Sequence, residues 1–202
     1  MVVFDGRGHD WAARVSTVGR DRVGVDLVER LDPRPEPRVR VTLAVALLKG
    51  DEMDTVVRDA TALGVRAIAP FVSTHSMIPA SARQSKAVER WSRIAVASAK
   101  QCGRAFVPEI HACRTFSEVL AEPADVRVVF VEPAKGVAIE AWPAEPPLTA
   151  VIYVGPEGGW ASDELRRAGN AGARFVTLGS RTLRAGLTPM AGLSSLWTRW
   201  GW

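Results

Sequence analysis

The chain has 202 residues, of which 47% are hydrophobic and 24% are charged, and this composition is typical of a globular protein with one substantial core. No apolar stretch approaches the roughly 18 residues that a membrane-spanning helix needs, and the N-terminus lacks the basic and apolar regions of a signal peptide. The two cysteines, Cys102 and Cys113, fit no metal-binding or redox spacing, so we expect a cytoplasmic protein without a metal site.

Positive charge is concentrated in two segments, although the formal net charge is only +4. Residues 81–114 carry seven Lys or Arg against two Glu, and residues 166–202 carry six Arg and no acid. Basic segments beside an otherwise acidic remainder are typical of a protein that binds a polyanion. A solvated helix face is the alternative interpretation of the same charges.

The N-terminal part predicts a small β unit. Residues 13–18 and 22–28 have strand-like composition and are separated by a turn signal at 19–21, so they predict a hairpin. A hairpin of this size is not stable alone. Prolines at positions 33, 35 and 37 exclude a helix or a central strand in the next segment and indicate a stiff linker. We therefore expect two domains, residues 1–35 and residues 36–202.

Strands and helices alternate through the second of these domains. Strands are expected at 41–48, 65–72, 126–131, 149–154 and 173–178, and helices at 51–63, at 85–102, from 162 and from 188. This alternation predicts an α/β fold with a mainly parallel sheet that is covered by helices on both faces.

Two glycine turns follow strands near the C-terminus. The first is Gly155-Pro156-Glu157-Gly158-Gly159, and the second begins at Leu178-Gly179, about 20 residues later. Small ligands bind beyond the carboxyl ends of strands in open α/β sheets, so the two turns predict two walls of one pocket. The first turn lacks the lysine of a phosphate loop and the spacing of a dinucleotide fingerprint. It suits a neutral or cationic ligand, although a plain connecting turn is the alternative.

These motifs resemble the RsmE family of SPOUT methyltransferases. The specific parts are Gly-Pro-Glu-Gly-Gly before an aromatic residue and Leu-Gly-x-Arg-x-Leu-Arg at 178–184, and residues 47–54, 62–70 and 101–108 resemble other family segments. Family members use S-adenosylmethionine to methylate N3 of a uridine in 16S ribosomal RNA of the small subunit, and they form homodimers. Their cofactor lies in a C-terminal trefoil knot, a rare topology. The resemblance implies this fold, cofactor and these partners.

The resemblance also implies the site residues. The cofactor would be bound by Val131 and Glu132, by Val154, Gly155, Pro156, Glu157, Gly158 and Gly159, and by Leu178, Gly179, Leu183 and Arg184. The RNA would be contacted by Arg7, Lys49, Gln101 and Arg104. For Arg104, an ordinary solvated arginine near a helix C-terminus is the alternative.

The chemistry of uracil methylation assigns a role to Arg184. N3 of uracil must lose a proton while its carbonyl oxygens gain negative charge, and a positioned arginine stabilises that charge. Arg184 is therefore the expected catalytic residue, whereas no residue stands out as the base. The target base would have to be unpaired or flipped out of a helix.

The chain departs from the family pattern at two places. After Leu-Arg the family usually continues Thr-Glu-Thr-Ala, but this chain reads Ala185-Gly186-Leu187-Thr188, so a hydroxyl and a carboxylate are lost. The family also begins with a fuller PUA-like RNA-binding barrel, of which we expect only a partial version here. An RNA-binding relative with reduced or lost catalysis is therefore the alternative function.

The aromatic C-terminus has two interpretations. Trp197, Trp200 and Trp202 lie in or just after the last expected helix, and packing in the core is the ordinary role of such residues. A dimer interface is the second interpretation, because tryptophan is enriched at interfaces between protomers.

Overall fold

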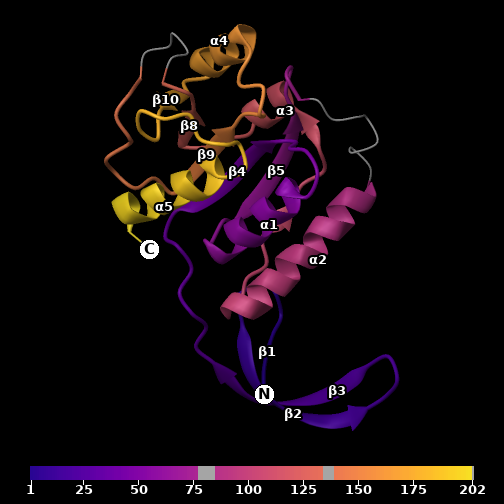
Figure 1. Ribbon diagram of the computed structural model, residues 1–202. Coiled ribbons are helices and arrows are strands. Elements are labelled where there is room, and N and C mark those ends of the chain that lie inside the picture. Colours follow the sequence, from indigo (N-terminus) through magenta and orange to yellow (C-terminus); the bar gives the residue numbers. More distant parts are fainter. Residues whose placement is uncertain (77–84, 134–138, 202) are drawn as a thin grey trace.

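The computed structural model describes residues 1–76, 85–133 and 139–201 and contains two separate sheets (Figure 1). The smaller sheet is antiparallel, with the order β1 (Val2–Phe4), β2 (Asp10–Val18) and β3 (Val23–Leu31). The expected hairpin is confirmed, and both of its strands are longer than their sequence signals. The division into domains at residue 35 stays a prediction.

The small sheet is attached to the rest of the chain through the segment that follows α2. The N–H of Gly8 donates to the carbonyl of Ala105 over 3.1 Å, and the N–H of Val107 donates to the carbonyl of Gly6 over 3.0 Å. Beyond this attachment, β2 and β3 project away from the larger unit (Figure 1). Large apolar side chains on this ribbon are exposed, among them Val18 and Val28.

The larger sheet is parallel at every pairing among the described strands. Its order is β10-β8-β9-β4-β5-β6, and β7 also pairs with β5. The strands are β4 (Arg40–Ala46), β5 (Ala67–Val72), β6 (Glu109–Ile110), β7 (Arg114–Thr115), β8 (Val126–Phe130), β9 (Thr149–Val154) and β10 (Arg174–Val176). The predicted α/β fold with a mainly parallel sheet is confirmed.

Helices cover both faces of this sheet because successive buried side chains point to opposite sides. On β9, Ile152 and Val154 belong to one apolar cluster, whereas Val151 and Tyr153 belong to the other. The first cluster includes side chains of α1 (Glu52–Ala62), α2 (Ser85–Cys102) and α5 (Thr188–Trp200), and the second includes those of α3 (Phe116–Leu120) and α4 (Ser162–Asn170).

The last helix contacts both the sheet and the segment that connects β8 to β9. Gly192 of α5 packs directly on Phe130 of β8, and near the end of the helix Trp200 Nε1 donates to the carbonyl of Pro143 over 3.0 Å. Trp197 and Trp200 are only 6% and 4% exposed, so both are core residues; Trp202 lies outside the described residues. Arg199 also donates to the carbonyl of Pro143; the trefoil knot stays a prediction.

Candidate functional site

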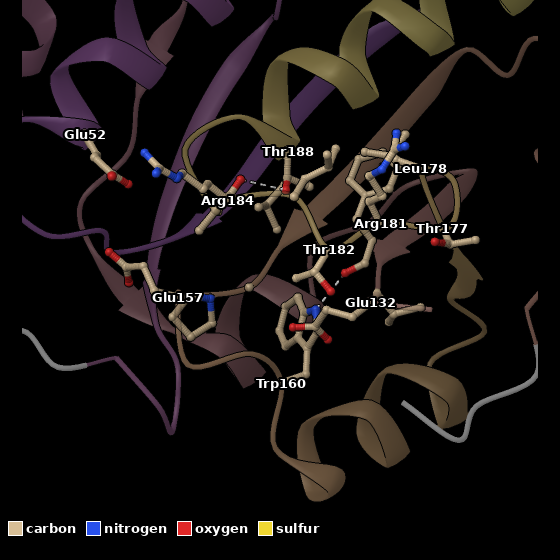
Figure 2. Close-up of a pocket in the computed structure, with 17 residues that line it drawn as sticks. Glu52, Glu132, Glu157, Trp160, Thr177, Leu178, Arg181, Thr182, Arg184 and Thr188 are labelled. Atoms are coloured by element: carbon tan, nitrogen blue, oxygen red, sulfur yellow. Dashed lines mark hydrogen bonds between the residues drawn. The ribbon is translucent and has the colours of Figure 1, made fainter. Parts of the chain in front are cut away.

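A cavity of about 390 Å³ opens at the carboxyl ends of β8, β9 and β10 (Figure 2). This is the edge at which ligands bind in open α/β sheets, and the volume is in the range of small-molecule sites. The lining combines apolar, acidic and basic side chains from four segments of the chain: Glu52; Phe130, Val131 and Glu132; Val154, Gly155, Pro156, Glu157 and Trp160; and Thr177, Leu178, Arg181, Thr182, Leu183, Arg184, Ala185 and Thr188.

Most of the residues expected to bind the cofactor line this cavity. Those that do are Val131, Glu132, Val154, Gly155, Pro156, Glu157, Leu178, Leu183 and Arg184. Gly158, Gly159 and Gly179 do not line it. Gly159 and Gly179 have φ values of 69° and 110°, which only glycine adopts readily, so both shape the turns that carry the lining residues.

The first glycine turn is held at both ends by contacts with distant segments. A side-chain oxygen of Glu157 accepts a hydrogen bond from the N–H of Lys49 over 3.0 Å. Trp160 is buried, and its Nε1 donates to the carbonyl of Phe130 over 2.8 Å. A Cβ at Gly155 would lie 2.9 Å from the Trp160 ring. The turn therefore needs glycine at this position, because any larger residue would clash with the indole. These contacts give the cavity a fixed wall.

The second wall is a tight turn that begins at Arg184. The carbonyl of Arg184 accepts from the N–H of Leu187 over 2.9 Å and from both the N–H and the hydroxyl of Thr188 over 3.0 Å. Its side chain is exposed and extends toward Glu52 (Figure 2). Within residues 1–76, 85–133 and 139–201, no ion pair engages its guanidinium, so the charge is available to a ligand.

Glu52 places a carboxylate beside the second loop, where the usual family sequence would carry one of its own. Its Oε2 lies 3.1 Å from the position that a Cβ of Gly186 would occupy, so the carboxylate of α1 rests against the loop itself. Glu52 was not expected at the site, because it lies about 100 residues before the first turn and only the pairing of β4 with β9 brings it there. With Glu132 and Glu157 it makes the cavity suitable for a cationic group.

The four residues expected to contact RNA do not lie together. Arg7 and Gln101 are exposed near the attachment of the small sheet, whereas Lys49 is exposed at the opposite end of the large sheet, beside Glu157. The RNA contacts of these three residues stay predictions.

The burial of Arg104 does not favour its expected RNA contact, which stays a prediction. Its side chain is only 7% exposed, and its guanidinium donates to the Glu36 carboxylate, with Nε 2.9 Å from Oε1, and to the carbonyls of Thr61 and Val65. Both interpretations from the sequence required a solvated side chain. Arg104 instead joins the linker, α1 and the turn between α1 and β5, because a buried guanidinium is satisfied by several acceptors at once.

Arg7 lies on a loop whose conformation is stabilised by the carboxylate of Asp5. Asp5 accepts hydrogen bonds from the N–H groups of Arg7 and His9 over 2.7 and 3.1 Å and is paired with the His9 ring. Partial desolvation alone would raise the pKa of Asp5, but these hydrogen bonds outweigh it and lower the pKa to about 2. The carboxylate is therefore ionised at neutral pH, and the loop keeps its shape.

The described residues contain neither a metal-binding cluster nor a membrane-spanning helix. No group of three or more His, Cys, Asp or Glu side chains is placed there to hold a metal ion. In the same ranges, no helix is long and apolar enough to cross a membrane.

The fold and the cavity define an α/β protein with a small-molecule site at the carboxyl ends of its parallel strands. Residues 34–197 match the family described as the RNA methyltransferase domain. The chain therefore belongs to this family of RNA methyltransferases, and relatives named ribosomal RNA small subunit methyltransferase E confirm the resemblance of its motifs to the RsmE family.

Individual relatives agree with this assignment. Ribosomal RNA small subunit methyltransferase E of Synechocystis is 32% identical over 97% of this chain and 65% of the relative, and that of Bacillus subtilis is 28% identical over 94% and 77%. The chain thus spans about two thirds of the length of the first of these curated relatives. Among solved structures, the corresponding methyltransferase of Neisseria gonorrhoeae, bound to S-adenosyl methionine, has a TM-score of 0.89 and 28% identity over 99% of this chain and 83% of its own. A methyltransferase of Legionella pneumophila with bound cofactor SAM has the same TM-score and 25% identity, over 98% and 81%.

Proposed function

We propose that the protein methylates N3 of a uridine in 16S ribosomal RNA, with S-adenosylmethionine as the methyl donor. The observation that carries this proposal is the cavity between the two glycine turns, which matches the position of the family's cofactor motifs. The cofactor-bound structures of similar proteins support the choice of ligand.

The lining of the cavity fits this cofactor. Phe130, Val131 and Leu178 offer apolar surface to an adenine ring, and carboxylates at the rim suit the positive charges of the methionine part. The turn at 155–160 would hold the adenosine, since its glycines allow a ligand to approach the backbone closely. When bound, the cofactor supplies an activated methyl group.

The residues of the chain act mainly by positioning and by electrostatic stabilisation. The two walls hold the reacting groups in line, which lowers the barrier without further chemistry. Arg184, exposed beside the cavity, would stabilise the negative charge on the uracil carbonyls once N3 has lost its proton. The proton acceptor is not assigned to a residue.

The partners follow from the same proposal. The substrate would be 16S ribosomal RNA in the small ribosomal subunit, and the protein would act in the cytoplasm as a homodimer with a C-terminal trefoil knot. The dimer is tested by sedimentation equilibrium, where a mass near that of one chain at micromolar concentration would contradict it.

Two measurements on the purified protein test the activity. Calorimetry with S-adenosylmethionine should give a single class of sites, and small subunits that lack the methyl mark should acquire one methyl group, located by mass spectrometry of RNA fragments. No cofactor binding by the folded protein would overturn the proposal. Binding of cofactor and RNA without methyl transfer would instead support the RNA-binding relative, whose basis is the altered loop at 185–188.

A further inference from the structure

Glu164 is an unusual residue because it is a buried acid. Its side chain is 2% exposed, and no other Asp or Glu among residues 1–76, 85–133 and 139–201 is buried. In the same ranges no Lys or Arg forms an ion pair with it. A buried carboxylate without a cation is costly unless several hydrogen bonds satisfy it.

Three donors satisfy this carboxylate, and helix capping explains only one of them. The N–H of Ala161, just before α4, donates to Oε2 over 3.0 Å, which is the ordinary contact of a Glu in the first turn of a helix. The Ser73 hydroxyl donates to Oε2 over 3.1 Å, and the N–H of Thr74 donates to Oε1 over 3.0 Å. Ser73 and Thr74 directly follow β5, about 90 residues earlier in the chain.

The residue after Thr74 contacts the first glycine turn directly. His75 Nδ1 lies 3.0 Å from the carbonyl of Gly159, so the ring nitrogen donates to that oxygen. A Cβ at Gly158 would lie 2.9 Å from the Cβ of His75, so the glycine lets the histidine pack against the turn. Gly158 does not line the cavity, and this contact is the role the structure gives it.

We infer that Glu164 is a positioning residue for the cofactor wall, acting through Ser73, Thr74 and His75. The carboxylate fixes the segment after β5, and His75 on that segment fixes Gly158 and Gly159. The turn is thereby held in the conformation that binds its ligand. This inference rests on the proposed function, because it takes the turn at 155–160 as the wall that binds S-adenosylmethionine.

The substitution Glu164→Gln disturbs the carboxylate that fixes the segment after β5. The amide keeps the size and one acceptor but presents an NH₂ group to donors that need an oxygen, so one contact with Ser73, Thr74 or Ala161 is lost. A misplacement of about 1 Å in a binding element costs on the order of a hundredfold in rate, and we expect at least a tenfold rise in the dissociation constant and KM for S-adenosylmethionine. The KM for RNA should stay within twofold of the wild-type value.

Two further variants keep the inference testable if Glu164→Gln folds poorly. His75→Phe retains a ring beside Gly158 but cannot donate to Gly159, and we expect it to weaken cofactor binding at least threefold. Glu118→Gln is the matched control, because Glu118 caps α3 through Thr115 in the same way but makes no contact with the turn. It should lower the melting temperature without changing the KM for the cofactor.

Hydrogen exchange supplies a readout that does not need activity. Amides of residues 157–160 should exchange faster in Glu164→Gln and in His75→Phe than in the wild type, and at the wild-type rate in Glu118→Gln. If the wild type binds the cofactor while both site variants bind it equally well and exchange normally, Glu164 is only a helix cap and the inference is wrong. If the wild type itself binds no cofactor, the proposed function fails, whereas the exchange result still reports on the contact.

Discussion

Arg184 is the residue on which turnover should depend most. Its guanidinium is exposed at the cavity and is not ion-paired within the described parts of the chain, whereas its backbone is fixed by Leu187 and Thr188. We expect Arg184→Ala to lower kcat by about a hundredfold, as for the loss of one donor to a developing negative charge. The dissociation constant of the cofactor should change by less than about threefold, because apolar groups and the first turn supply most of the binding.

Single-turnover methylation and calorimetry measure these two quantities separately. Arg174→Ala is the control, since Arg174 is an exposed arginine that does not line the cavity. Equal losses of cofactor affinity and of rate in Arg184→Ala would assign Arg184 to cofactor binding alone.

Arg104 should be a stabilising residue without a role in RNA binding. Arg104→Met keeps the alkyl packing but removes the donor to the carbonyl of Val65 and to the carboxylate of Glu36, whereas the carbonyl of Thr61 keeps the N–H of Gly64. Loss of one partner from such a buried network costs about 3 kcal/mol, which denaturant unfolding would measure. RNA affinity of the folded variant should equal that of the wild type, and a selective loss of RNA affinity would restore the interpretation made from the sequence.

Some of the individual residues of the site could be predicted from the sequence, and others could not. The glycine turns could be predicted because their glycines are visible in the sequence directly after strands. The structure shows why glycine is required there: an indole packs on Gly155 and a histidine packs on Gly158. Glu52, Glu164 and His75 were not predicted. Each contacts residues that are distant in the sequence, and only the order of the strands brings these residues together. The burial of Arg104 was not predicted, because a basic residue near a helix end looks the same in sequence whether it is solvated or buried.

Among the elements, α5 depends on a glycine that brings it close to the sheet. A Cβ at Gly192 would lie 2.3 Å from Cε2 of Phe130, whose side chain is 5% exposed and lines the cavity. Helix propensity favours alanine over glycine by up to about 1 kcal/mol, but overpacking a rigid core costs about 1–3 kcal/mol. We expect Gly192→Ala to lower the free energy of unfolding by about 1 kcal/mol or more and to weaken cofactor binding.

Urea unfolding and calorimetry would test both effects. Ser195→Ala, an exposed substitution in the same helix, should change the free energy of unfolding by less than about 0.5 kcal/mol. An increase in stability of Gly192→Ala would mean that Phe130 moves aside without cost, and that the close approach of α5 is not needed.

Long, buried elements were predictable, whereas three of the shortest strands were not. The expected ranges for α2 and β9 coincide with the observed bounds, because apolar periodicity is strong over helices of this length and over fully buried strands. β1, β6 and β7 contain two or three residues each, too few for a periodic signal. α3 is also short, although Thr115 and Glu118 form the capping box that marks its start.

At the scale of the whole molecule, the basic side chains of residues 81–114 and 166–202 differ in whether they form ion pairs with acidic residues. Arg166 and Arg167 on α4 are both paired with Asp163, and Arg90 on α2 is paired with Asp51 and Asp54 of α1. Arg181 and Arg184 line the cavity and are exposed. Lys86, Arg93 and Lys100 of α2 are also exposed, and no ion pair engages them among the described residues. The field that attracts RNA should therefore include both the second loop and α2, whereas the arginines of α4 should contribute less.

The salt dependence of RNA binding tests this distribution. Each phosphate contact releases counterions, and the slope of log K against log salt changes by about 0.7 for each contact with single-stranded nucleic acid. We expect Arg181→Ala to reduce the steepness by about this amount, measured by filter binding to a 16S fragment. Arg166→Ala should change the slope less than Arg181→Ala does, because Arg166 does not line the cavity and shares the Asp163 carboxylate with Arg167. Equal reductions in both variants would mean that RNA responds to the net charge of the C-terminal segment and not to the loop beside the cavity.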